Sequence, residues 1–176
     1  AGSQETPTLY TVTVNGNERL LLITACPGWG TDSAGNQYGF NVSYSDDDGE
    51  TWSEYEHFYS YFSDGDANDA IVAMASLVQL KDENGNYIEK WMGVFHNYAM
   101  VNYKTYLTFD EAGNMQWTEP VPYLSEYRSI ESGHQICEVG MFRSPDGNRI
   151  VALARSQSHM NLSTMFYSDD EGETWS

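Results

Sequence analysis

Two charged side chains in the last third of the chain are placed to act together. Glu138 lies near the start of an apolar segment, residues 136–143, and Arg155 ends the next one, residues 149–155. The turn-forming run 144–148 separates them, so we expect a hairpin that brings both side chains to one edge. A guanidinium can hold a carboxylate ligand through paired hydrogen bonds, and a carboxylate can accept a proton. The alternative is an ion pair, buried or facing solvent, without a functional role.

A short acidic loop in the first half of the chain offers further carboxylates. Asp64, Asp66 and Asp69 precede an apolar segment that starts at Ala70. A solvated acidic loop is the plainer interpretation of such a run. A calcium loop built on Asp64, Asp66 and Asn68 is another alternative, although the EF-hand pattern fails because Asp69 stands where glycine is needed.

Histidines and cysteines are few. His96 and His134 are each isolated from other metal-ligating residues in the sequence, so we expect mainly structural roles for them. The sequence contains no phosphate-binding loop, zinc-ligand cluster or Ser-His-Asp elbow, and we therefore predict no metal and no cofactor. Cys26 and Cys137 are too few to form a disulfide scaffold, and we favour two buried free thiols over one disulfide.

A repeated turn marks the elements that must position these groups. The run SDDDGETW at residues 45–52 returns as SDDEGETW at residues 168–175, and a degenerate copy lies at residues 108–118. Ser and Asp side chains bond nearby backbone N–H groups, and Gly supplies a strained backbone position. We expect Asp47 and Asp170 on hairpin turns at an outer rim, far from any pocket, with each Thr-Trp re-entering a strand. The positions that define the two clear copies are Ser45, Asp47, Gly49, Trp52, Ser168, Asp170, Gly172 and Trp175.

The rest of the pattern is typical of an all-β protein. Segments rich in β-forming residues alternate with turns such as Asn15-Gly16, and aromatic residues make up 14% of the chain. The three tryptophans of the turns recur with a period of roughly 60 residues, which indicates a repeat architecture. We expect at least ten strands in three antiparallel sheets, over residues 8–53, 70–118 and 134–176. The first sheet should take its fourth strand near Trp52, and the last should be incomplete at its C-terminal edge.

The S-x-D-x-G-x-T-W motif resembles the Asp box, or BNR repeat, of the sialidase (neuraminidase) superfamily. Segments 74–80, 92–96 and 137–147 are also similar to blades of bacterial exo-sialidase-like proteins. The resemblance implies a sialidase-type β-propeller, of which the chain holds about three four-stranded antiparallel blades, roughly half of a six-bladed wheel. Propellers close with about four to eight blades. We therefore expect further blades in a longer polypeptide, or a second copy that completes the ring.

The resemblance also implies roles for named residues. Glu138 matches the glutamate that activates a tyrosine nucleophile, and Arg155 matches one of three arginines that hold the substrate carboxylate. Asp69 is the candidate acid/base, while His96 and His134 could line the central mouth as substrate-binding residues. The family's first arginine motif is missing from this sequence, and its tyrosine nucleophile and third arginine are expected from later blades.

The expected function follows from that likeness. We expect a fragment, inactive by itself, of an exo-alpha-sialidase-type glycoside hydrolase that acts on glycans ending in sialic acid or a related sugar. The alternative is a non-catalytic Asp-box propeller that binds glycans or proteins, because the Asp box also occurs outside sialidases. Either function has a carbohydrate or protein partner, and the resemblance implies a secreted or extracytoplasmic protein.

Composition excludes two classes of partner. The formal net charge of −18 gives no basic face for nucleic acid and opposes adsorption to anionic membranes. No run of apolar residues is long enough to span a bilayer. We therefore predict no nucleic-acid and no membrane partner.

Overall fold

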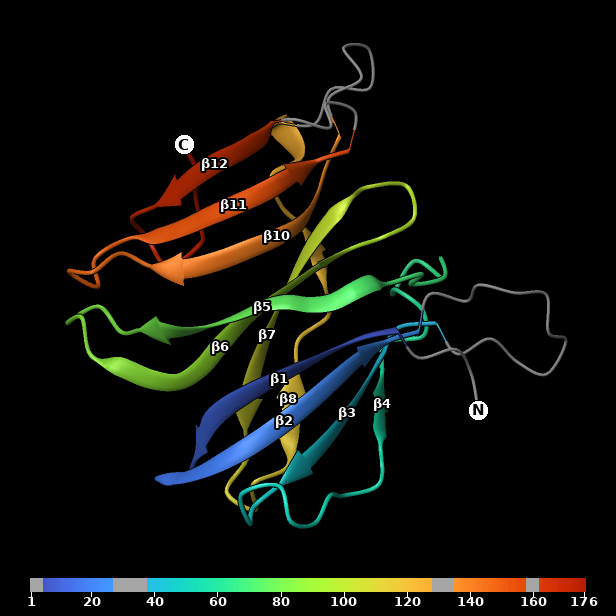
Figure 1. Cartoon of the computed structure of the whole chain (residues 1–176), viewed down its shortest axis with the longest axis vertical. Helices are drawn as coiled ribbons and strands as arrows, with labels where there is room; N and C mark the ends of the chain where they lie inside the picture. The colour runs from blue at the N-terminus through green and yellow to red at the C-terminus, as the bar shows by residue number, and fades with distance from the viewer. Residues whose placement is uncertain (1–4, 27–37, 128–134, 158–161) are drawn as a thin grey trace, which may run out of the picture.

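A computed structural model describes residues 5–26, 38–127, 135–157 and 162–176. Within these residues the chain forms twelve strands in three antiparallel sheets, which confirms the all-β prediction (Figure 1). A single turn of 3-10 helix, η1 (Ser125–Tyr127), is the other element. None of the described residues belongs to a helix with the length and apolar character needed to cross a membrane.

Strand order follows chain order in every sheet. The first sheet contains β1 (Glu5–Val14), β2 (Asn17–Ala25), β3 (Phe40–Ser45) and β4 (Glu56–Phe58). The second contains β5 (Ile71–Lys81), β6 (Tyr87–His96), β7 (Asn102–Phe109) and β8 (Met115–Trp117), with β9 (Val121–Pro122) also paired to β7. The third contains β10 (Ile136–Arg143), β11 (Ile150–Ser156) and β12 (Ser163–Ser168). Three sheets built in this way fit a partial propeller.

The inner strands of the three sheets, β1, β5 and β10, lie next to one another (Figure 1). Each carries a β-bulge in its first half, where its register against the second strand of its sheet shifts. Each bulge contains at least one residue with positive φ, which is uncommon outside glycine. The residues at matching places are Thr6 (45°), Val72 (50°) and Glu138 (49°). The three sheets therefore repeat one unit in backbone detail as well as in strand order.

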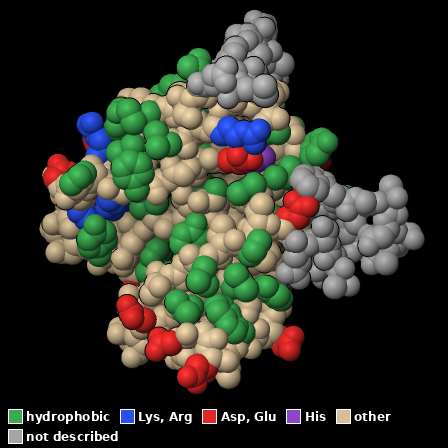
Figure 2. All heavy atoms as spheres, in the orientation of Figure 1, with side chains coloured by type: hydrophobic (Ala, Val, Ile, Leu, Met, Phe, Trp, Pro, Cys, Tyr) green, Lys and Arg blue, Asp and Glu red, His purple; other side chains and the backbone are tan. Residues whose placement is uncertain are grey.

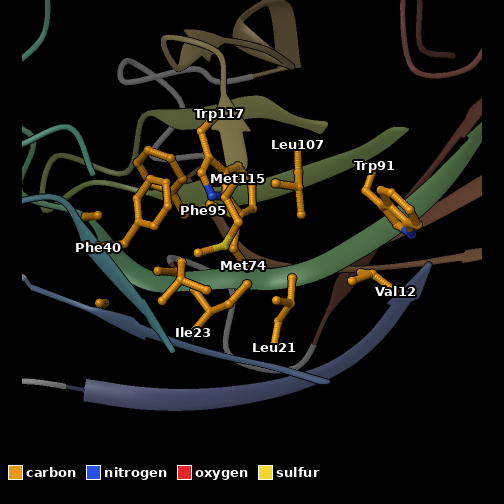
Figure 3. Packing of buried hydrophobic residues seen from close by; sticks show 14 of the residues in the cluster. Val12, Leu21, Ile23, Phe40, Met74, Trp91, Phe95, Leu107, Met115 and Trp117 are labelled. Carbon is orange, nitrogen blue, oxygen red and sulfur yellow. The ribbon is translucent and has the colours of Figure 1, made fainter. Parts of the chain in front are cut away.

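Two apolar layers hold the sheets together. One lies between the first and second sheets, where Phe40 meets Trp117 edge-on at 5.1 Å between ring centroids (Figure 3). The other lies between the second and third sheets and includes Met92 and Phe166. Packing in the first layer is tight, because a Cβ on Gly93 would lie 2.3 Å from Met74 Sδ. Any larger residue at Gly93, which pairs with Leu77 of β5, would therefore force the Met74 side chain to move.

Both clear Asp boxes form the turns that the sequence predicts. Asp47 accepts hydrogen bonds from the Thr51 backbone N–H at 2.8 Å and from the Thr51 hydroxyl, while the Ser45 hydroxyl donates to it at 2.7 Å. Asp170 repeats these bonds with Thr174 and Ser168. The serine of each box, Ser45 or Ser168, is buried, with 2% of its surface exposed. The boxes are structural turns closed by one carboxylate.

One expectation for the boxes was wrong. A small open hollow of about 200 Å³, lined in part by Ser45 and Asp48, adjoins the first box, so that box does not lie far from every pocket. The hollow also takes in Arg19, whose guanidinium is bonded to Asp46 at 2.7 Å. Arg19 therefore pairs with Asp46, whereas the Asp47 carboxylate bonds only residues of its own turn among the described residues.

The path of the chain after each box also differs from the prediction. Thr51-Trp52 does not re-enter a strand, because the Trp52 indole folds back and donates to the Gly49 carbonyl at 3.1 Å. The fourth strand, β4, therefore begins at Glu56 instead of near Trp52. Only the degenerate third copy places its tryptophan, Trp117, in a strand.

The residue that follows each tryptophan is nevertheless equivalent in all three sheets. Its backbone N–H donates to the carbonyl of a tyrosine in the third strand at 2.9 Å. The pairs are Ser53 with Tyr44, Thr118 with Tyr106, and Ser176 with Tyr167. This shared bond confirms that Trp52 and Trp175 occupy equivalent places. The third sheet ends there, with three strands in the described residues.

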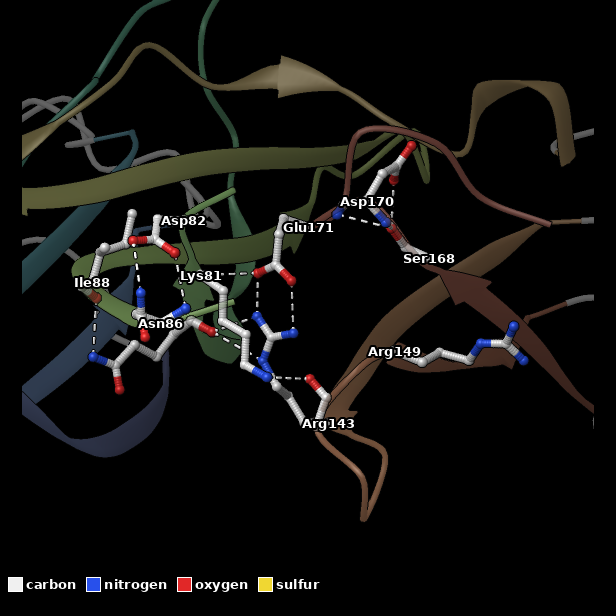
Figure 4. A network of polar contacts seen from close by, with 12 residues as sticks. Lys81, Asp82, Asn86, Ile88, Arg143, Arg149, Ser168, Asp170 and Glu171 are labelled. Carbon is white, nitrogen blue, oxygen red and sulfur yellow. Dashed lines mark hydrogen bonds and ion pairs between the residues drawn. The ribbon is translucent and has the colours of Figure 1, made fainter. Parts of the chain in front are cut away.

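Polar side chains also connect the second and third sheets (Figure 4). Arg143 at the end of β10 forms an ion pair with Glu171 of the second box and donates to the Gln79 carbonyl of β5 at 2.8 Å. Glu171 in turn accepts the Lys81 backbone N–H at 2.8 Å. The box of one sheet is thereby fixed to the inner strand of its neighbour.

Candidate functional site

Glu138 and Arg155 meet where β10 begins and β11 ends. Cys137 pairs with Arg155 in the strand register, and the bulge at Glu138 follows directly. A bulge re-aims the side chain it carries. The Glu138 carboxylate lies 2.7 Å from an Arg155 guanidinium nitrogen, with the side chains 40% and 54% exposed. The predicted hairpin contact therefore exists, as an ion pair that reaches solvent.

His96 occupies the matching place on the neighbouring sheet. It is the last residue of β6 and pairs with Ile71, the residue before the positive-φ Val72 of β5. Arg155, the second-last residue of β11, pairs in the same way with Cys137, the residue before the positive-φ Glu138 of β10. Its ring is buried, with 3% exposed, and Nδ1 lies 2.9 Å from the Asn97 carbonyl. Burial lowers the pKa of His96, so the ring is neutral at pH 7.

Asp69 lies just before β5, close to His96. Its carboxylate accepts the Tyr98 backbone N–H at 3.2 Å, which ties it to the turn after His96. Burial raises the pKa of Asp69, and the charges of Asp69, Glu138 and Arg155 all act on His96. The structure thus brings four predicted site residues to one region. The fifth, His134, lies outside the described residues.

Asp64 and Asp66, the other acidic residues of the loop before β5, line a different hollow. Asp64 accepts the Asp66 backbone N–H at 3.0 Å, and both line an open hollow of about 280 Å³ together with Glu119. Asn68 is buried and donates to the Tyr59 carbonyl at 2.9 Å. The loop therefore separates Asp64 and Asp66 from Asp69, and its buried Asn68 belongs to the fold.

Sequence reasoning missed one member of the site. Cys26 and Cys137 are both buried free thiols, as predicted, but Cys137 also lies against His96 and Glu138. One potential ligand atom from each of these three residues falls within 4.8 Å of the others. It is the one such group of His, Cys, Asp and Glu side chains among the described residues. The sequence did contain a signal for Cys137, because it directly precedes Glu138 and lies opposite Arg155 in the predicted hairpin.

The region is polar and accessible from one face. Basic, acidic and histidine side chains meet on the face that Figure 2 shows, next to hydrophobic side chains. A half-exposed guanidinium, a half-exposed carboxylate and a carboxyl with raised pKa can together bind an acidic ligand and exchange protons with it.

Comparison with known proteins agrees with the architecture. A Hadza microbial sialidase, Hz136, superposes with a TM-score of 0.58 at 18% identity, over 98% of this chain and 36% of its own. A Trypanosoma rangeli sialidase in complex with sialic acid gives a TM-score of 0.52 at 16% identity, over 100% of this chain and 30% of its own. No curated protein sequence matches significantly. The chain therefore has the fold of these β-propellers and spans about a third of their length.

The family follows from the sequence match. The model of the BNR repeat-like domain matches residues 3–176, which is nearly the whole chain. That match agrees with the two Asp boxes, the three repeated sheets and the sialidase neighbours. The chain belongs to the BNR repeat-like domain family, and its fold is that of part of a sialidase-type β-propeller.

Proposed function

We propose that this chain supplies part of the mouth of a glycoside hydrolase that removes terminal sialic acid, or a related acidic sugar, from glycans. The observation that carries the proposal is the solvent-reaching ion pair of Glu138 and Arg155, with Asp69 close by in the loop before β5. Exposed ion pairs contribute only about 0–1 kcal/mol to stability, so stability alone gives little reason for a charge pair at this bulge.

Arg155 is the proposed ligand for the sugar carboxylate. Among the described residues it makes one side-chain hydrogen bond, from Nη1 to Glu138, so most of its five donors stay available. A second carboxylate can approach the 54% exposed guanidinium without displacing Glu138. Arginine binds carboxylates bidentately, which fixes the sugar in orientation as well as in place.

The carboxyl groups have separate proposed roles. The raised pKa of Asp69 suits a general acid, which must hold its proton near neutral pH. Glu138 is the proposed proton acceptor for a tyrosine from another blade, because a tyrosine with its ordinary pKa of about 10 needs a base. The chain spans about a third of the sialidases it resembles, so the nucleophile and further arginines belong to the rest of the polypeptide.

A fluorogenic sialoside tests the proposal on the natural polypeptide that carries this chain. Glu138→Gln and Asp69→Asn should each lower kcat by about 100-fold or more, the usual contribution of a positioned acid or base. Glu50→Gln, at the rim of the first box, is the matched control and should leave kcat unchanged. Binding of sialosides with no turnover would favour the non-catalytic propeller, and neither binding nor turnover would end the proposal.

A further inference from the structure

Three potential metal-ligand atoms lie together at the mouth, and the proposed sialoside chemistry uses Glu138 but gives no role to His96 or Cys137. A ring nitrogen of His96, the Cys137 sulfur and a Glu138 carboxylate oxygen lie within 4.8 Å of one another. Tetrahedral zinc, with bonds of about 2.0–2.3 Å, keeps its ligand atoms about 3.3–3.8 Å apart. Small side-chain rotations would therefore close the three atoms around one ion.

The histidine is oriented for such an ion. Nδ1 lies 2.9 Å from the Asn97 carbonyl, so Nδ1 carries the proton and Nε2 carries the lone pair. His96 is only 3% exposed, and its Nε2 is buried without a hydrogen-bond partner among the described residues. An unsatisfied buried acceptor costs about 1–3 kcal/mol. A metal-binding histidine usually donates one ring N–H to a backbone carbonyl or carboxylate and binds the metal through its other nitrogen.

The cysteine is available as well. Cys137 is a free thiol, 1% exposed, and lies in the strand beside Arg155. A cysteine binds a metal as its thiolate, so the thiol proton has to leave. A cation displaces that proton on binding, as in other thiolate sites.

The second and third sheets hold these groups in fixed positions. The Asn102 side chain, paired with His96 in the β6–β7 register, donates to the Ile136 carbonyl of β10 at 2.9 Å. This buried bond connects the start of β7, which pairs with the end of β6, to the residue before Cys137. Both ligands therefore lie on strands, which hold metal-site geometry better than loops do.

We propose that His96 Nε2, Cys137 Sγ and a Glu138 carboxylate oxygen bind a divalent cation of zinc-like softness, with a fourth position open to water or ligand. A His-Cys-carboxylate set suits Zn²⁺, whereas Mg²⁺ and Ca²⁺ require oxygen ligands. Glu138 then has one carboxylate oxygen on the metal and one for Arg155, and the bound cation lowers the basicity of the whole carboxylate. The site is therefore a switch on the mouth: where the proposed hydrolase holds, Zn²⁺ binding weakens its proton acceptor.

Cobalt spectroscopy tests the site without any sialoside. Reduced, chelator-treated protein is titrated with Co²⁺, and the thiolate-to-cobalt charge-transfer band is followed. We expect the band to saturate at one Co²⁺ per chain and to disappear when Zn²⁺ is added. His96→Gln and Glu138→Gln should weaken Co²⁺ binding at least tenfold, because even loss of a residue that supports a ligand costs about 10–100-fold.

Cysteine variants provide the matched control. Cys137→Ser should abolish the band, whereas Cys26→Ser, which removes the other buried thiol, should leave it intact. Circular dichroism shows whether both variants are folded. If Cys137→Ser does not fold, Cys137→Ala is used in its place. No charge-transfer band with wild-type protein, or a band that survives loss of Cys137, overturns the site and leaves the proposed hydrolase untouched.

Discussion

At the residue scale, each Asp box depends on one carboxylate. Asp47 receives bonds from the backbone and hydroxyl of Thr51 and from the hydroxyl of Ser45, all within its own loop. Such contacts span at most four residues, so local sequence was sufficient to predict them. The same argument covers Asp110, which bonds the Asn114 backbone N–H at 2.8 Å in the degenerate copy.

Removal of that carboxylate should destabilise the protein without affecting the mouth. Asp47→Ala leaves the Thr51 N–H and hydroxyl without their partner, so the melting temperature should fall. Glu50→Ala, in the same loop, is the control and should melt close to wild type. Thermal denaturation followed by circular dichroism gives both values. A loss of sugar binding at unchanged melting temperature would show that the box is a binding site instead of a turn.

The same carboxylate should titrate abnormally. The Thr51 hydroxyl bond, followed by the Thr51 backbone and Ser45 bonds, lowers the pKa of Asp47 to about 2. Because the folded pKa lies below the unfolded one, its stabilising effect is present at neutral pH and is lost as pH falls from about 4 to about 2. Thr51→Val should raise the pKa toward its ordinary value, as measured by carboxyl-carbon NMR. An unchanged titration midpoint would contradict the assignment.

At the element scale, the bulged inner strands position the site. Register between β10 and β11 places Cys137 opposite Arg155, and the hairpin itself was predictable from its turn. The bulge at Glu138 was not, because positive φ at a glutamate depends on the neighbouring sheets. His96 and Cys137 lie on different sheets, so their contact depends on how the sheets pack. Local sequence patterns do not predict such a contact.

Contacts between sheets should contribute measurably to stability. Arg143→Ala removes the ion pair with Glu171 and the bond to the Gln79 carbonyl, both largely shielded from solvent. We expect a loss of roughly 2 kcal/mol in the free energy of unfolding, as for hydrogen bonds to charged groups. Arg149→Ala, which breaks the exposed pair with Asp169, should cost much less. Urea unfolding compares them, and equal losses would contradict a special role for Arg143.

At the scale of the whole molecule, the third sheet leaves an apolar face open. Leu153 pairs with Met165, and Val151 pairs with Phe142, so these side chains share one side. Phe142, Leu153 and Met165 are 50%, 42% and 50% exposed. In a propeller the next blade packs against such a face. Remaining blades or a second copy are the partners expected there.

That face should make the chain associate when it is alone. Sedimentation velocity should show self-association, and the Leu153→Glu, Met165→Glu double variant should reduce it because charges then occupy the face. Val121→Glu is the control, since Val121 is 45% exposed on the second sheet. A wild-type chain that stays monomeric at high concentration would show that this face needs no partner.

We propose that the mouth recognises an acidic sugar through Arg155, and a titration of the chain with sialic acid measures that recognition. Wild-type chain should bind sialic acid in preference to galactose. Arg155→Ala should weaken binding by about 10–100-fold, the effect of losing a charged hydrogen-bonded pair. Arg149→Ala, on the same hairpin but paired with Asp169 at the rim, should bind as wild type does. Equal binding by the wild type and Arg155→Ala would show that Arg155 does not bind the sugar.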